Sequence, residues 1–127
     1  MSGEMLDTNV IIKYLSGDQS AKQLIDNNNN ISVSAIVVGE LQYGAQKSSK
    51  KDENTAMFAE FLSDFNIVPI DESVAIIYGS VKEQLRVMGV NIPENDMWIA
   101  ATAISQKSRL LTYDKHFSKI YGLNIKN

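Results

Sequence analysis

The stretch MLDTNVIIKYL, residues 5–15, places a carboxylate between two segments with the pattern of buried structure. Two apolar residues precede Asp7, and two short polar residues follow it. Over residues 10–15 the apolar side chains then recur at helical spacing. This pattern predicts a short strand, a helix and a charge held at their junction. Because a buried carboxylate is costly unless a partner compensates it, the position of Asp7 needs an explanation.

Short apolar runs and amphipathic segments alternate along the rest of the chain, without an internal repeat or a linker. Strands that alternate with helices predict a parallel sheet covered on both faces. The predicted strands are residues 5–6, 31–33, 67–70 and 110–112, with residues 123–125 as a candidate fifth. The predicted helices lie around residues 10–15, 21–25, 37–45, 54–65, 74–88 and 95–107.

The composition is that of an ordinary globular protein. A length of 127 residues favours one domain, over residues 1–127, and a hydrophobic share of 44% suffices for a core. No apolar run approaches the roughly 20 residues of a membrane span, and the N-terminus lacks the pattern of a signal peptide. The absence of cysteine excludes disulfides and thiolate zinc sites, so we expect a cytoplasmic protein with no membrane segment.

The net charge of −3 does not by itself indicate a nucleic-acid partner, although a local basic face or bound cations would attract one. Most of the 15 acidic residues have structural explanations. Asp18 and Asp71 each precede a predicted helix and are expected to be N-caps. Others open a helix or lie on solvent faces; these are Asp26, Asp52, Glu53, Glu60, Asp64, Glu72 and Glu83.

Four acidic residues are harder to explain. Asp7 and Asp114 follow the first and fourth predicted strands, and ligands of open parallel sheets bind outside the carboxyl ends of the strands. Asp96 opens a strongly apolar helix, and Glu40 is the only charge in the helix around residues 37–45. Taken alone, Asp96 could complement a helix dipole and Glu40 could face solvent. Taken together, the four are expected to converge on one site.

Such a group of carboxylates predicts a cation. Clustered carboxylates repel one another, and some protonate unless a cation compensates the charge. Hard oxygen ligands suit Mg²⁺ or Mn²⁺, which bind through a few carboxylates together with waters and substrate phosphates. Asp7 at the strand–helix junction is therefore interpreted as a holder of a divalent metal, with Thr8 as the cap of the following helix.

The four acids lie in segments that resemble the motifs of the PIN-domain ribonucleases, in particular the VapC-type toxins of bacterial toxin–antitoxin pairs. LDTNVII, with Asp7, resembles the first motif, and SVSAIVVGELQYG, with Glu40, the second. IPENDMWIAATAI, with Asp96, is similar to the third motif, and RLLTYDKHF, with Asp114, to the fourth. The four segments follow one another in the order and at the distances of the family, over nearly the whole chain.

The resemblance implies a three-layer α/β/α sandwich with a parallel sheet of four or five strands. It also implies endonucleolytic cleavage of RNA that depends on Mg²⁺ or Mn²⁺, inhibition by a cognate antitoxin, and a homodimer. Two positions depart from the family pattern. Glu4 stands where an apolar residue is usual, so an altered or frayed first strand is expected, and Val90 stands where a basic residue is frequent.

The proposed chemistry assigns roles to the four acids. Asp7 and Asp96 are the first choice as direct metal ligands, and Asp114 is a third ligand or holds a ligating water. Glu40 holds a second metal or orients the attacking water. A divalent metal lowers the pKa of bound water and polarises a phosphoryl oxygen, which are the requirements of phosphodiester hydrolysis.

Other polar residues near these motifs are weaker candidates. Thr112 can hydrogen-bond within the site, but a structural role is favoured, and Asn9 either orients a carboxylate or starts the helix. His116, the only histidine, suits a general base, but an exposed helix position is favoured. Met97 and Trp98 are expected in the core. Candidate phosphate contacts are Lys13, Lys47, Lys50, Lys51 and Lys115.

Two other functions are compatible with parts of the pattern. A phosphate-transfer enzyme of the dehalogenase type would use Asp7 as nucleophile, but such enzymes need a second Asp two residues on, where this chain has Asn9. A PIN fold kept as a binding module without catalysis would usually have lost some of the four acids. A nuclease assay with Mg²⁺ and with EDTA separates these alternatives.

Overall fold

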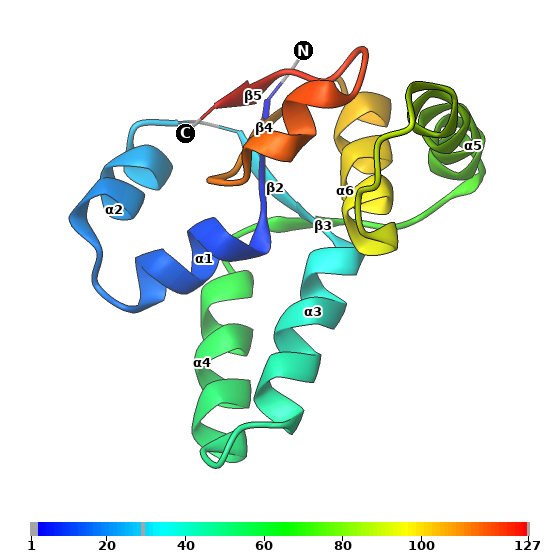
Figure 1. Cartoon of the computed structure of the whole chain (residues 1–127). Coiled ribbons are helices and arrows are strands. Elements are labelled where there is room, and N and C mark those ends of the chain that lie inside the picture. The colour runs from blue at the N-terminus through cyan, green and yellow to red at the C-terminus, as the bar shows by residue number, and fades with distance from the viewer. Residues whose placement is uncertain (1–2, 29, 127) are drawn as a thin grey trace.

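The computed structural model describes residues 3–28 and 30–126, and its centre is a five-stranded sheet in the order β3-β2-β1-β4-β5 (Figure 1). All its strand pairs are parallel. The strands are β1 Glu4–Leu6, β2 Ile31–Ser34, β3 Asn66–Val68, β4 Arg109–Leu111 and β5 Ile125–Lys126. The helices are α1 Thr8–Leu15, α2 Gln19–Asp26, α3 Ala35–Gln46, α4 Lys51–Leu62, α5 Glu72–Met88 and α6 Glu94–Ser105, with a short 3-10 helix, η1, at Lys115–Lys119.

The helices cover both faces of the sheet, so the predicted three-layer α/β/α sandwich is confirmed. In Figure 1, α1 and α2 lie on one side of the sheet and α5 and α6 on the other, while α3 and α4 project from one end as a hairpin. The chain proceeds from β1 to β2 to β3 in one direction and then returns through α5 and α6 to β4, on the opposite side of β1. This reversal between β1 and β4 creates the crevice at the carboxyl edge where open α/β sheets bind ligands.

The core forms where the central strands meet the helices on both faces. Met5, Leu6, Leu110 and Leu111 are fully buried, as expected for central parallel strands that are covered on both sides. Ile99 of α6 is fully buried as well, because the helix of residues 94–105 has apolar residues around most of its circumference. Among the described residues, no helix is long and apolar enough to cross a membrane.

The N-terminal strand differs from the expectation of a frayed or altered end. Glu4 is the first residue of β1, and its register partner on β4 is Arg109. The Glu4 carboxylate accepts a hydrogen bond from Nε of Arg109 at 2.8 Å, in a half-buried ion pair. The charge at this position is therefore matched across the strand pair, between residues that are partners in the register of β1 and β4.

Several boundaries differ from the predicted ones for local reasons. The third strand ends at Val68, before Pro69, because proline has no N–H for the ladder. The candidate fifth strand forms, but at Ile125–Lys126. The predicted N-caps are confirmed: the carboxylate of Asp18 accepts from the backbone N–H of Ala21, and that of Asp71 from Val74, both at 3.0 Å. The run DNNNN, residues 26–30, predicts a helix end followed by a loop, and of this run Asn29 lies outside the described residues.

Candidate active site at the carboxyl edge of the sheet

Asp7 lies at the junction of β1 and α1 and is 5% exposed. Its backbone N–H donates to the carbonyl of Leu111 at 2.9 Å, so the residue remains attached to the end of β4. Its backbone is extended, and its Oδ1 accepts from the backbone N–H of Thr8 at 2.8 Å. Asp7 is therefore itself the N-cap of α1, and the prediction that Thr8 caps this helix is wrong.

Burial raises the pKa of the Asp7 carboxyl from 3.8 to about 6. The hydrogen bonds from Thr112 and from the Thr8 backbone act in the opposite direction, and the neighbouring carboxylates of Asp96 and Glu40 raise the pKa further. The charged form of Asp7 is thus disfavoured by its surroundings, which is the situation that a bound cation would relieve.

Thr112 is the centre of a buried hydrogen-bond network that holds this part of the site. The side chain is fully buried, and its hydroxyl donates to Oδ2 of Asp7 at 2.7 Å. The hydroxyl oxygen of Thr112 also accepts from the backbone N–H of Asp114 at 3.0 Å and from Nδ2 of Asn9 at 3.4 Å. Oδ1 of Asn9 in turn accepts from the backbone N–H of Tyr113 at 3.2 Å. Thr112 and Asn9 therefore fix the end of β1 against the end of β4.

Glu40 reaches the same region from α3, which begins after β2. The helix is started by Ser34, whose hydroxyl accepts from the backbone N–H of Val37 at 3.2 Å. One oxygen of the Glu40 carboxylate accepts from the hydroxyl of Thr8, and the other from Nδ2 of Asn95 at 3.4 Å. Both oxygens of Glu40 therefore have donors from other elements that set the direction of the carboxylate.

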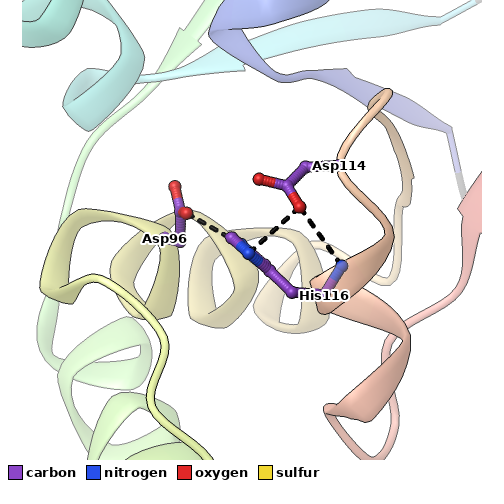
Figure 2. A group of neighbouring side chains, drawn as sticks. All are labelled: Asp96, Asp114 and His116. Carbon is purple, nitrogen blue, oxygen red and sulfur yellow. Dashed lines mark hydrogen bonds and ion pairs between the residues drawn. The ribbon is translucent and has the colours of Figure 1, made fainter.

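Asp96 and Asp114 are joined by His116, as Figure 2 shows. Asp96 lies in the first turn of α6, and its Oδ2 is 2.9 Å from Nε2 of His116. The Nδ1 atom of the same ring is 3.0 Å from Oδ1 of Asp114. Asp114 is also the N-cap of η1, since Oδ1 accepts from the backbone N–H of His116 at 3.2 Å.

The preference for an exposed His116 on a helix surface is therefore wrong. The ring is half-buried and lies between the carboxylates of Asp96 and Asp114 (Figure 2). The two ring nitrogens thus contact one carboxylate each, and which nitrogen donates depends on the tautomer. Burial raises the pKa of the Asp96 carboxyl, and its attraction to His116 opposes that rise.

The four acids line one open cleft of about 540 Å³. Its other lining residues are Thr8, Asn9, Ile12 and Lys13. The structure thus brings together Asp7 from the end of β1, Glu40 from α3, Asp96 from the start of α6 and Asp114 from the end of β4. Among the described residues that line the cleft, Lys13 is the only cation.

The comparisons with known proteins agree with this geometry. The family model of the PIN domain matches residues 5–123 of the chain, a range that contains all four acids. The chain belongs to the PIN-domain family. The predicted family is therefore confirmed.

This PIN domain is 35% identical to Ribonuclease VapC2 of Rickettsia felis, over 97% of this chain and 96% of the relative. It is 29% identical to the tRNA(fMet)-specific endonuclease VapC of Salmonella typhimurium, again over 97% and 96%. Among solved structures, a chain of VapBC2 from Rickettsia felis, bound to a DNA fragment from their promoter, matches with a TM-score of 0.92 at 33% identity. That match covers 98% of this chain and 97% of the other.

The remaining predicted residues of the PIN domain lie outside the cleft. Met97 is buried in the core as expected, whereas Trp98 is only half-buried and stacks on Tyr78 of α5 with ring centroids 3.8 Å apart. Three of the candidate lysines lie at the turn from α3 to α4, which Figure 1 shows projecting away from the sheet; these are Lys47, Lys50 and Lys51. The exposed Lys115 begins η1 beside Asp114.

Proposed function

We propose that this chain is a divalent-metal-dependent endoribonuclease and the toxin of a type II toxin–antitoxin pair, acting as a single domain in the cytoplasm. The observation that carries the proposal is the meeting of four carboxylates, from segments distant in sequence, in one cleft of a chain similar to VapC ribonucleases. The cleft lies at the topological switch point of the sheet and is open to solvent.

The residues of the cleft fit Mg²⁺ or Mn²⁺. Its acidic side chains offer hard oxygen donors, and burial, followed by the neighbouring carboxylates, raises the pKa values of Asp7 and Asp96, so a bound cation would favour their charged forms. Ligand atoms of Asp96, Asp114 and His116 lie within 4.8 Å of one another. We assign Asp7 and Asp96 as direct ligands, Asp114 as a third ligand or the holder of a ligating water, and Glu40 as the holder of a second metal or of the attacking water.

When bound, the metal would supply an activated water and neutralise charge on the phosphoryl group. The protein's own contribution is the orientation of the carboxylates. Thr112 holds Oδ2 of Asp7, Thr8 and Asn95 hold the two oxygens of Glu40, and His116 holds one oxygen each of Asp96 and Asp114. Outer partners of this kind fix the direction of ligating carboxylates and usually matter nearly as much as the ligands.

A cleavage assay tests the proposed activity. The purified protein should cut single-stranded RNA in Mg²⁺ or Mn²⁺, lose the activity in EDTA, and recover it when the metal is added in excess. A generic phosphomonoester incubated in parallel should remain intact, because the second Asp of a dehalogenase-type phosphatase is absent. RNA binding without cleavage under all metal conditions would instead identify a PIN fold that serves only as a binding module.

We also propose a cognate antitoxin as partner, and a homodimer as the active form. The relative of known structure from Rickettsia felis is a VapBC2 complex. In this chain, Ile12 of α1 lines the cleft and is 46% exposed, and Tyr43, which follows Glu40 by three residues on α3, is 66% exposed. An antitoxin helix with apolar anchors suits such a surface, and an arginine at its end would pair with the carboxylates bidentately.

Inhibition by such an arginine predicts competition with the metal. The affinity of the antitoxin encoded beside the toxin gene should fall about tenfold when Mg²⁺ reaches about ten times its own dissociation constant, by mass action at shared oxygens. The measurement is a titration of antitoxin against toxin at several Mg²⁺ concentrations, with ionic strength held constant by NaCl. If the affinity does not change with the Mg²⁺ concentration and the toxin is still inhibited, the antitoxin only blocks access of the RNA to the cleft.

A further inference from the structure

His116 is the only histidine of the chain, and each nitrogen of its ring faces a carboxylate (Figure 2). Nε2 is 2.9 Å from Oδ2 of Asp96, and Nδ1 is 3.0 Å from Oδ1 of Asp114. A neutral imidazole has one N–H, so one of its nitrogens donates while the other presents a lone pair. A lone pair and a carboxylate oxygen at such a distance repel each other unless a proton or a metal ion joins them. The ring therefore offers one nitrogen to a cation.

The surroundings of the two carboxylates indicate which nitrogen this is. Oδ1 of Asp114 already accepts from the backbone N–H of His116 at 3.2 Å, because Asp114 is the N-cap of η1. This oxygen is thus held as an acceptor, and Nδ1 is the ring nitrogen beside it. Among the described residues, the carboxylate of Asp96 has no hydrogen-bond partner other than Nε2. We therefore assign the N–H to Nδ1, which donates to Asp114, and the lone pair to Nε2, which lies toward Asp96.

Histidines that bind metals in proteins usually have this arrangement. Such a histidine donates its second N–H to a carboxylate, a backbone carbonyl or a water, which fixes the tautomer and the direction of the ring. In this chain Asp114 is the acceptor, and the ring also packs on the buried Phe117, with ring centroids 4.8 Å apart. The direction of Nε2 is therefore set from two sides.

The distance between Nε2 and Asp96 fits a pair of atoms that bind the same ion. Neighbouring ligand atoms of an octahedral divalent ion lie about 3 Å apart when each bond to the ion measures about 2.1 Å. The two atoms here are 2.9 Å apart. An ion from solution can reach them, because the side chains of His116 and Asp96 are 29% and 17% exposed and Asp96 lines the acidic cleft.

We propose that His116 is itself a metal ligand: Nε2 binds the ion that Asp96 holds, while Nδ1–H donates to Asp114. The inference rests on the metal-dependent activity proposed above, and it extends the ligands from oxygen alone to oxygen and nitrogen. Mg²⁺ takes oxygen ligands, whereas transition-metal ions accept imidazole nitrogen as well. The carboxylates suit both Mg²⁺ and Mn²⁺, and His116 should therefore make the site prefer Mn²⁺.

Pulsed electron paramagnetic resonance of the protein with bound Mn²⁺ tests the nitrogen ligand directly. The protein is purified without a histidine tag, so that any coupling between Mn²⁺ and an imidazole nitrogen comes from His116. The wild type should show this coupling, and incorporation of ¹⁵N-labelled histidine should change it. His116→Asn should lose the coupling, because the shorter asparagine side chain can place its amide near Nδ1 but does not reach the position of Nε2.

Calorimetric titrations with Mn²⁺ and with Mg²⁺ measure the preference between the ions. His116→Asn should weaken Mn²⁺ binding about tenfold or more, the loss typical when a metal site loses one supporting group, and should weaken Mg²⁺ binding less. The control is Ser118→Ala on the same short helix. Ser118 is exposed, and its hydroxyl donates to the carbonyl of Lys115 at 2.8 Å. This variant should keep the nitrogen coupling and both affinities of the wild type.

The measurement on the wild type decides the inference whether or not the variants fold. If Mn²⁺ binds and RNA is cleaved but the wild type shows no nitrogen coupling, His116 only positions the two carboxylates. The inference is then overturned, with the ribonuclease assignment intact. A coupling that persists in His116→Asn, or an equal loss of Mn²⁺ affinity in Ser118→Ala, would overturn it too. A wild type that neither binds Mn²⁺ nor cleaves RNA would overturn the assignment and this inference together.

Discussion

Asp96→Asn should reduce RNA cleavage at least about a hundredfold, the loss typical when one group that stabilises the developing charge is removed. Asp96 enters the cleft from the first turn of α6, and its Oδ2 is 2.9 Å from His116. Asparagine keeps the shape of the side chain and removes its negative charge. The initial rate of cleavage at saturating Mg²⁺, measured with a defined RNA, gives the size of the effect.

The matched control for this variant is Glu94→Gln. Glu94 belongs to the same first turn of α6, but its carboxylate is exposed and pairs with Lys82 at 2.8 Å, outside the residues that line the cleft. An exposed pair of this kind contributes little, so Glu94→Gln should cleave RNA at nearly the wild-type rate. If Asp96→Asn cleaves as fast as the control, Asp96 has no part in the metal site and only complements the helix dipole.

Much of the site could be predicted because it follows from local patterns. Asp7 comes after a short apolar run and before a helical pattern, and this position alone places it at the carboxyl edge of a parallel sheet. Asp114 has the same relation to β4, and the apolar context of Glu40 and Asp96 singled these two out. The common feature is a charge where the surrounding residues predict burial.

The parts that could not be predicted depend on contacts between distant elements. His116 meets Asp96 only because η1 packs beside the start of α6, and no local pattern around a lone histidine indicates such a contact. The position of His116 two residues after Asp114 did indicate a contact between these two, because Asp114 caps the short helix η1 and so lies close to the His116 ring. Thr112 was assigned a structural role, but its hydroxyl joins Asp7, Asn9 and the backbone of Asp114. A strand-end threonine reveals such partners only when the neighbouring strand is known.

The exchange of roles between Asp7 and Thr8 has the same origin. The sequence pattern allowed either residue to cap α1, because aspartate and threonine are both good N-caps. In the structure Asp7 caps the helix with Oδ1, and the hydroxyl of Thr8 donates to Glu40 of α3. The contact with Glu40, which lies 32 residues away, decides between the two assignments.

The second large effect concerns the stability of the metal-free protein. The pKa of Asp7 is about 6 in the folded chain, above its ordinary 3.8, so between these values the folded state binds more protons than the unfolded state. The free energy of unfolding should therefore fall as the pH rises through this window and level off above it. Asp7 is almost fully buried, and its share of the loss is on the order of 3 kcal/mol.

Asp7→Asn should remove this share, so in EDTA the variant should be more stable than the wild type at neutral pH. The pKa of Asp96 is raised as well, so Asp96 changes the free energy of unfolding with pH in the same direction as Asp7 does. This contribution is present in both the wild type and the variant. The difference between wild type and variant, measured by urea denaturation from about pH 4 to about pH 8, isolates Asp7 and should grow with pH. Asp18→Asn is the control of opposite sign, because hydrogen bonds from Ser20 and Ala21 lower the pKa of Asp18 and stabilise its charged form.

Mg²⁺ should offset the destabilisation that a charged Asp7 causes in the metal-free protein, and the same ion is required for the proposed activity. A cation that binds only the folded state stabilises it in proportion to the logarithm of its concentration, and a charged Asp7 should strengthen that binding. Adding Mg²⁺ at neutral pH should therefore stabilise the wild type more than Asp7→Asn and reduce or reverse the difference seen in EDTA. If Asp7→Asn is less stable than the wild type in EDTA at every pH, Asp7 is required mainly as the cap of α1. Equal responses of the two proteins to Mg²⁺ would remove Asp7 from the metal site.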